Sequence, residues 1–193
     1  MSNNLYIIAG CNGAGKTTAS FTILPEILNC FEFVNADEIA RGLSPFQPEK
    51  VALEAGRIML KRIDELFKLK VDFAFETTLA SKTYKEKVLY AQANGYKVTL
   101  LFLWLRNVEL AIERVKSRVE EGGHNIPEEI IRRRYTRGLK NLLKIYLPLV
   151  DGFMIIDNSD TEYNLIAEKN IGDEIFINDT QKWEKLKNKY NGN

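Results

Sequence analysis

The sequence has only two cysteines and one histidine in 193 residues. Cys11 and Cys30 have neither the spacing of a metal-binding pair nor the number needed for a disulfide framework. A single histidine, His124, cannot build a histidine-based metal site. These counts exclude a zinc module and a disulfide-rich scaffold.

The sequence also lacks a long hydrophobic run and an excess of either charge. The longest apolar segment, residues 100–105, is much shorter than the roughly 18 residues of a membrane helix, and too few apolar residues follow Met1 for a secretory signal. Lys and Arg number 27 against 26 for Asp and Glu, a formal net charge of +1. Proteins that hold long nucleic acids usually carry a large basic excess. We therefore expect a cytoplasmic protein whose partners include neither a membrane nor a long nucleic acid.

Apolar and amphipathic segments alternate along the chain without a repeat or a linker. Short apolar runs predict five strands, at residues 5–9, 31–35, 71–75, 98–105 and 153–156. Helical periodicity predicts helices over residues 16–28, 47–70 and 82–93, from about residue 108 to the glycines at 122–123, and over 127–147. Residues 165–177 are harder to assign, and a polar helix is expected around Trp183.

This alternation predicts an α/β fold, with a parallel sheet and helices on both of its faces. The length of the chain suits one domain, residues 1–193. Ligands of such folds bind at the carboxyl ends of the strands. Motifs that follow a predicted strand therefore carry the functional argument.

Residues 10–17, Gly-Cys-Asn-Gly-Ala-Gly-Lys-Thr, follow the first strand and match a phosphate-binding loop. Glycines let backbone N–H groups converge on phosphate oxygens, and the next helix points its positive end at the same anion. A turn that merely links a strand to a helix is the alternative, but a chance match has odds of about one in a hundred at average glycine content. Lys16 would reach the β- and γ-phosphates, and Thr17 would ligate Mg²⁺. We predict that ATP contacts Gly10, Asn12, Gly13, Ala14, Gly15, Lys16, Thr17 and Thr18.

Acidic residues follow the second and third strands. Asp37 would lie near the γ-phosphate, where a carboxylate accepts a proton from an attacking hydroxyl or holds Mg²⁺; the alternative is an acid that only suits a helix N-terminus. Glu76 would bind substrate hydroxyls or water on Mg²⁺, and the alternative is a helix-capping or loop carboxylate. Thr77 and Thr78 lie at the same edge, and one of them is expected to be an ordinary turn residue.

Basic residues flank the glycine pair at 122–123. Arg118 before it and Arg134 after it fit a helical lid, about residues 118–134, that closes over ATP and clamps the transferred phosphoryl group. Arg114 shares a helix face with Arg118 and is the alternative lid arginine. His124 is expected to be a hydrogen-bonding lid residue.

A second basic set projects away from the apolar side of its helix and is expected to be a solvated face, with a nucleic-acid contact as the minor alternative. Its members are Arg133, Arg137, Lys140 and Lys144.

Together, these segments resemble the zeta-toxin family of P-loop kinases. The resemblance rests on residues 10–18, 35–40, 75–79 and 114–141, and it covers about residues 5–160. It implies ATP-dependent phosphorylation of a hydroxyl on a nucleotide sugar, UDP-N-acetylglucosamine in the best-known members. It further implies the roles of five residues: Asp37 as base, Lys16 as P-loop lysine, Glu76 as substrate contact, and Arg118 and Arg134 as phosphate-facing arginines.

We therefore expect a P-loop kinase with a helical lid, which uses ATP and Mg²⁺ to phosphorylate a small-molecule hydroxyl. Glu76 and Thr77 would bind the acceptor, and Thr17 the metal. A kinase of a nucleoside, a nucleic-acid end or an antibiotic is one alternative. The other is a nucleotide-binding toxin module that an antitoxin protein holds silent.

Overall fold

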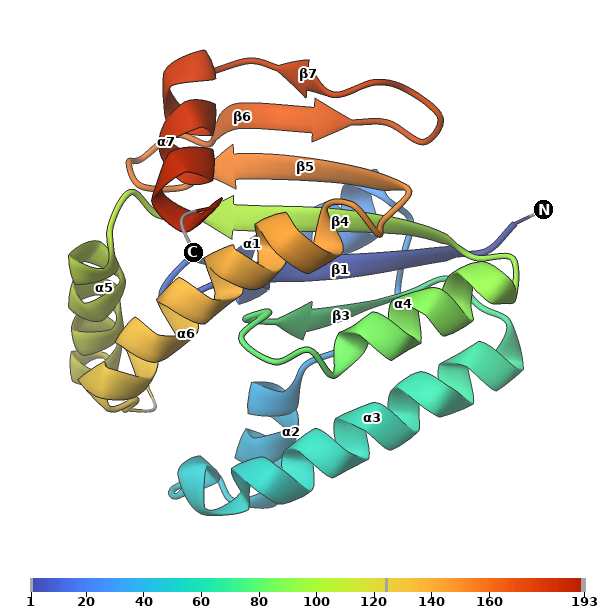
Figure 1. The fold of residues 1–193 in the computed structure, drawn as a ribbon. Helices are drawn as coiled ribbons and strands as arrows, with labels where there is room; N and C mark the ends of the chain where they lie inside the picture. Colours follow the sequence, from blue (N-terminus) through green and yellow to red (C-terminus); the bar gives the residue numbers. More distant parts are fainter. Residues whose placement is uncertain (1, 124, 192–193) are drawn as a thin grey trace.

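The predicted strands form the parallel part of a seven-stranded sheet (Figure 1) in a computed structural model that describes residues 2–123 and 125–191. The strand order is β2-β3-β1-β4-β5-β6-β7, and β1 runs parallel to both of its neighbours. The strands are β1 (Asn4–Gly10), β2 (Phe33–Val34), β3 (Phe73–Thr77), β4 (Lys97–Trp104), β5 (Gly152–Asp157), β6 (Asn164–Lys169) and β7 (Phe176–Ile177).

The prediction of a parallel sheet is correct for β1 to β5 and wrong for the last two strands. β6 pairs antiparallel to β5, and β7 pairs antiparallel to β6. Only residues 158–163 connect β5 to β6, whereas a crossover between parallel strands needs a dozen residues or more. The short connection therefore forces the chain to turn back.

The helices lie between the strands as the periodicity predicts, with differences at their ends. They are α1 (Lys16–Thr22), α2 (Ala36–Leu43), α3 (Ala52–Leu69), α4 (Tyr84–Ala93), α5 (Val108–Glu120), α6 (Glu128–Asn141) and α7 (Thr180–Asn191). Wider π-helical turns follow α1, at Ile23–Ile27, and α6, at Leu142–Tyr146. Pro25 lies in the first of these turns, and a proline cannot donate the N–H that an α-helix needs. The helix predicted over residues 16–28 therefore reaches Ile27, close to its predicted end near Pro25, but it is α-helical only to Thr22.

The core lies on both faces of the sheet. Side chains from the central strands, among them Leu5, Phe73 and Phe153, are at most 1% exposed. Figure 1 shows α4 and α6 across the face turned to the viewer. On the opposite face Leu24 packs with Ile8. None of the described helices is long and apolar enough to cross a membrane.

The carboxyl ends of the parallel strands meet at one edge of the sheet, on the left in Figure 1 beside α5. β1 leads there into the glycine loop, and β2 leads into α2. β3 continues two residues beyond its predicted end, so Glu76 lies within the strand, opposite Ile8. The acidic and glycine motifs are therefore brought together at this edge.

Gly138 sets how closely α6 approaches the loop after β3. A Cβ at this glycine would lie 2.5 Å from the carbonyl oxygen of Thr78, whereas a Cβ at Gly56, inside α3, would meet nothing within 4 Å. We expect Gly138→Ala to lower the free energy of unfolding by about 1–3 kcal/mol, the usual cost of overpacking. Gly56→Ala should raise it by roughly 0.5–1 kcal/mol, because alanine suits a helix interior better. Urea denaturation of both variants tests this, and equal shifts would contradict the close approach.

Candidate functional site

The glycine loop wraps the amino end of α1. Gly15 has φ +81°, a left-handed conformation, and a Cβ there would lie 2.7 Å from Nδ2 of Asn158. A Cβ at Gly10 would lie 2.4 Å from the carbonyl oxygen of Leu103. These glycines are therefore required by the packing of the loop as well as by access of backbone N–H groups to an anion.

Lys16 and Glu76 form a buried ion pair at the mouth of this loop. Lys16 Nζ lies 3.4 Å from Glu76 Oε1, and each side chain is 7% exposed. Lys16 Nζ also donates a hydrogen bond of 3.0 Å to the Cys11 carbonyl oxygen. Buried charges need such partners, because leaving one of them unpaired typically costs 3–5 kcal/mol.

The second carboxylate oxygen of Glu76 accepts two further hydrogen bonds. Thr17 Oγ1 donates to Glu76 Oε2 at 2.8 Å, and Asn35 Nδ2 donates to the same oxygen at 2.9 Å. Glu76 thus joins the glycine loop, β3 and the residue before α2. Among the described residues, Glu76 does not cap a helix. Its carboxylate contacts the side chains of Lys16, Thr17 and Asn35, and not the backbone N–H groups of a helix end.

Asn35 is a site residue that the sequence reasoning missed. Its Oδ1 accepts from the backbone N–H of Asp37 at 2.8 Å and of Glu38 at 3.4 Å, which makes it the N-cap of α2. Asparagine just before a helix is a strong capping signal. That signal was available in the sequence, although the contact from Asn35 to Glu76 was not.

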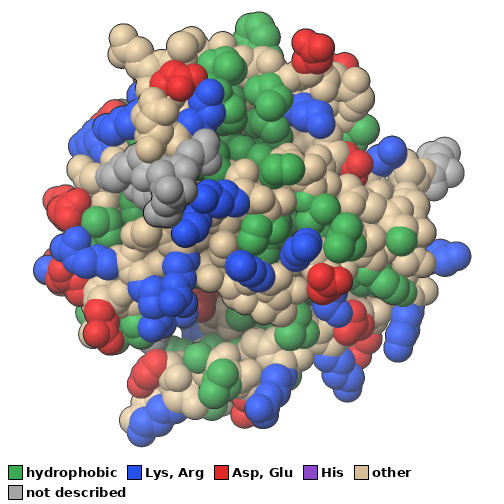
Figure 2. Space-filling model, viewed as in Figure 1, with side chains coloured by type: hydrophobic (Ala, Val, Ile, Leu, Met, Phe, Trp, Pro, Cys, Tyr) green, Lys and Arg blue, Asp and Glu red, His purple; other side chains and the backbone are tan. Residues whose placement is uncertain are grey.

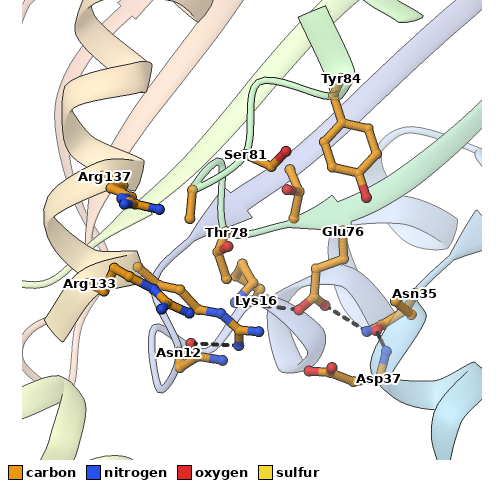
Figure 3. A pocket seen from close by; sticks show the side chains of 14 residues that line it. Asn12, Lys16, Asn35, Asp37, Glu76, Thr78, Ser81, Tyr84, Arg133 and Arg137 are labelled. Carbon is orange, nitrogen blue, oxygen red and sulfur yellow. Dashed lines mark hydrogen bonds and ion pairs between the residues drawn. The ribbon is translucent and has the colours of Figure 1, made fainter. Parts of the chain in front are cut away.

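Asp37 lies in the first turn of α2, and its role as a base or as a metal-holding acid stays a prediction. It suits the positive end of the helix, and it lines two adjacent cavities. Figure 3 shows Asp37 and Glu76 on the same side of the smaller cavity, with Arg133 and Arg137 of α6 on the other side.

The two cavities share one wall, formed by Asn12, Lys16, Asp37 and Glu76. The larger, about 830 Å³, extends along the glycine loop and is also lined by Thr17, Thr18, Arg114 and Arg118. The smaller, about 320 Å³, continues toward α4 and α6 and is also lined by Thr78, Ser81, Tyr84, Arg133, Arg134 and Arg137. In Figure 2 the surface is hollowed between α6 and α2, with basic side chains along α6 above the hollow.

Arg134 points inward, as the helical geometry predicts. Its Nη1 donates to Asn12 Oδ1 at 3.3 Å. Burial lowers the pKa of Arg134, and the nearby charge of Asp37 acts against that shift. The guanidinium therefore stands at the shared wall of the two cavities.

The expectation of a purely solvated face at Arg133 and Arg137 is wrong. Both side chains are exposed, yet they line the smaller cavity beside Arg134. The outward position belongs to Arg132, whose guanidinium pairs with Glu128 at 2.8 Å and with Glu109 at 2.9 Å. The polar side of α6 faces a cleft between this helix and α2, which the periodicity of a single helix cannot reveal.

Arg114 and Arg118 both line the larger cavity, so the choice between them as lid arginine stays open. Arg114 Nη2 donates to the Ser159 carbonyl oxygen at 3.2 Å. Asn158, next to it, donates from Nδ2 to the Ala14 carbonyl oxygen at 2.9 Å. The turn after β5 therefore belongs to the site, and no sequence motif pointed to it.

The glycine pair at 122–123 ends α5. The N–H of Gly122, at φ +87°, donates to the Val119 carbonyl, and the N–H of Gly123 donates to the Arg118 carbonyl. This is the hydrogen-bond pattern of a Schellman cap. The pair therefore has a structural role in addition to the hinge role predicted for it, and His124 lies outside the described residues.

Of the two threonines at this edge, Thr77 is the one that stabilises a turn, as predicted for one of the pair. It lines the smaller cavity, and its Oγ1 accepts from the Leu79 N–H at 3.1 Å, where Leu79 has φ +54°. Thr78 lines the same cavity.

Within residues 2–123 and 125–191, no group of three or more His, Cys, Asp and Glu side chains could hold a metal ion. The oxygens of Thr17 and Glu76, 2.8 Å apart, are of the type that Mg²⁺ prefers. Because Mg²⁺ is usually held by one or two protein groups together with substrate phosphates, these residues fit a metal shared with a bound nucleotide.

Comparison with known proteins identifies the family. The family model of the zeta toxin matches residues 2–170. The chain belongs to the zeta-toxin family. An uncharacterized protein of Haemophilus influenzae is 30% identical to this chain over 141 residues. The matched region covers 70% of this chain and 94% of that protein. The resemblance predicted from the motifs is thereby confirmed.

Solved structures share the zeta-toxin fold with this chain at low sequence identity. One chain in the crystal structure of AvrRxo1-ORF1 and ORF2 with ATP superposes on this chain with a TM-score of 0.77 at 16% identity. The match covers 96% of this chain and 63% of the AvrRxo1 chain. This chain therefore spans less than two thirds of the length of the AvrRxo1 chain. A structure from the PezAT toxin–antitoxin system of Streptococcus pneumoniae has a TM-score of 0.68 at 16% identity, over 100% of this chain and 88% of that chain.

The double role of Asn35 leads to a stability prediction. Asn35→Ala removes the cap of α2 and a donor to buried Glu76, whereas Asn107→Ala removes only the cap of α5, a 2.9 Å bond to the Leu110 N–H. A lost cap costs about 0.5–2 kcal/mol. We expect Asn35→Ala to cost roughly 1–3 kcal/mol more than the control, because a buried charge loses a hydrogen bond. Denaturant unfolding compares them, and equal losses would show that Asn35 acts only as a cap.

Proposed function

We propose that this protein is a kinase that uses ATP and Mg²⁺ to phosphorylate a hydroxyl of a small molecule, a nucleotide sugar such as UDP-N-acetylglucosamine. The observation that carries the proposal is the wall shared by the two cavities, which holds Lys16, Asp37 and Glu76. A phosphoryl donor on one side and an acceptor on the other would meet there. Membership of the zeta-toxin family supports the same reading.

ATP would place its phosphates on the glycine loop in the larger cavity, next to Lys16 and the N-terminus of α1. Thr17 would hold Mg²⁺ with Glu76 beside it, and the metal would neutralise charge on the β- and γ-phosphates. Arg118 and Arg134 line the cavities on either side and would stabilise charge on the phosphoryl group in flight.

The acceptor would occupy the smaller cavity with one hydroxyl toward Asp37. That carboxylate accepts the hydroxyl proton while the new oxygen–phosphorus bond forms and the bond to ADP breaks. Because this transition state is loose, orientation and electrostatics contribute more than base strength. Asn35 holds Asp37 at the start of α2, so the orientation is built into the helix cap.

Three arginines favour an acceptor that carries its own negative charge. Arg133, Arg134 and Arg137 line the smaller cavity, and Figure 3 shows Arg133 and Arg137 on the side opposite Asp37. One guanidinium group can donate two parallel hydrogen bonds to two oxygens of the same phosphate. Hydroxyl groups of Ser81 and Tyr84, on the same cavity, suit the hydroxyls of a sugar. A nucleotide sugar combines both features.

An antitoxin protein is the partner that the family suggests. The PezAT structure comes from a toxin–antitoxin system, and this chain exposes a large apolar side chain at the larger cavity. Phe21 lines that cavity and is 66% exposed, and its ring contacts the ring of Phe33 edge-on. An exposed apolar group of this kind supports an interaction surface for a partner.

The proposed base leads to the central experiment. With labelled ATP and UDP-N-acetylglucosamine or a metabolite extract, we expect Asp37→Asn to lower kcat by about a hundredfold or more, the usual contribution of a placed base, while ATP still binds. Lys16→Ala should weaken ATP binding itself, as calorimetry would show. Asp173→Asn, on the exposed turn between β6 and β7, is the matched control. A near-normal kcat in Asp37→Asn would show that this acid is not the base and only suits the N-terminus of α2.

The arginines of the site lead to a second kinetic prediction. Arg118→Lys and Arg134→Lys should each lose at least about tenfold in kcat, near 1.4 kcal/mol of barrier, with a smaller change in the KM for ATP. A single ammonium cannot copy the two-pronged contact of a guanidinium. Arg132→Lys is the control, because that side chain faces away and pairs with Glu109 and Glu128. If the control loses as much as the other two, the arginines do not act on the transferred group.

A further inference from the structure

A buried carboxylate lies behind the glycine loop and takes no part in the proposed chemistry. Asp157 ends β5 and is 3% exposed. Its Oδ1 accepts from the N–H of Ser159 at 2.9 Å and from the Ser159 hydroxyl, and its Oδ2 accepts from Lys182 Nζ at 2.8 Å. Burial by itself raises the pKa of Asp157, but the bonds from Lys182 and Ser159 outweigh it and lower the pKa. Asp157 is therefore an ionised anchor at the base of a turn.

This turn, residues 157–160, touches both sides of the nucleotide site. Asn158 Nδ2 donates to the Ala14 carbonyl oxygen at 2.9 Å, inside the glycine loop. The Ser159 carbonyl oxygen accepts from Arg114, which lines the larger cavity. The Ser159 hydroxyl also accepts from the Arg106 N–H at 2.8 Å. The position of the turn is thus linked to the positions of the glycine loop and of Arg114.

Lys182 comes from a part of the chain that the family match does not include. The zeta-toxin model ends at residue 170, and Lys182 lies in α7. α7 is held to the core independently, because Trp183 and Leu186 are buried there. The hydrogen bond to Asp157 raises the pKa of Lys182, which keeps the ammonium charged. The ion pair is therefore one of several contacts that attach the helix.

We propose that Lys182 is a positioning residue for the nucleotide site, which acts through Asp157 and the 157–160 turn on the glycine loop and Arg114. The inference rests on the proposed function, since it takes the larger cavity to hold ATP. Without Lys182 the buried charge of Asp157 loses its cationic partner, and a buried charge without a partner drives rearrangement or protonation. Either change weakens the hold of Asp157 on Ser159. The hydrogen bond from Asn158 Nδ2 to the Ala14 carbonyl oxygen and the one from Arg114 to the Ser159 carbonyl oxygen then loosen.

The test is the affinity for ATP with Mg²⁺, measured by calorimetry on the full chain together with Tm. We expect Lys182→Met to bind ATP about threefold to thirtyfold more weakly, the range seen for residues that act through a network. Lys182→Arg keeps the cation and should restore the affinity. Lys187→Met is the matched control, because it also removes an ion pair of α7, the one to Glu184 at 2.8 Å. Its ATP affinity should equal that of the wild type.

The double variant with Asn158→Ala tests the route. If Lys182 acts through the turn, Lys182→Met combined with Asn158→Ala should lose little more affinity than Asn158→Ala alone, since residues in one network are not additive. A lowered Tm with unchanged ATP affinity in Lys182→Met would overturn the inference and leave Lys182 as an anchor of α7. If Lys182→Met does not fold, unchanged affinity in Asn158→Ala overturns it equally. Absence of ATP binding in the wild type would instead defeat the proposed function, and this inference with it.

Discussion

The buried pair of Lys16 and Glu76 is the interaction on which the rest of the site depends. A carboxylate this far from water needs donors on both oxygens. Glu76 lies in β3, and its donors come from two other segments: Lys16 and Thr17 at the start of α1, and Asn35 before α2. Satisfying one buried charge therefore aligns three pieces of backbone. Asn35 carries the alignment one step further, because the same side chain caps α2 and so orients Asp37.

The sheet places these pieces at one edge, and the surrounding helices divide the space there. The glycine loop and α5 border the larger cavity, while α4 and α6 border the smaller one. The polar side of α6, which looks like a solvated face in isolation, becomes the arginine wall of a cleft because α2 stands opposite it (Figure 3). Behind the glycine loop another buried carboxylate, Asp157, accepts from Ser159 in its own turn and from Lys182 of α7.

Much of the fold and part of the site could be predicted because the signals are local. Apolar runs predicted five strands in nearly their observed positions, and glycines, a lysine and a threonine after the first strand predicted the phosphate loop. The errors have physical causes. The strand β6 reverses because six residues cannot form a crossover, and the helix predicted over residues 16–28 changes from an α-helix to a π-helical turn around Pro25. The glycines at 122–123 cap α5 through their hydrogen bonds, and the lid predicted around them stays a prediction.

The sequence by itself determined which chemical groups are present and where along the strands they would emerge: an anion-binding loop, two acids and a set of arginines. Only the tertiary structure decided their partners, because the deciding contacts join residues far apart in the chain. Asn158 reaches Ala14 across 144 positions, and Arg134 reaches Asn12 across 122. No periodicity or motif encodes such a pair. It follows from the order of strands and the packing of helices, which bring the ends of distant segments to the same edge of the sheet.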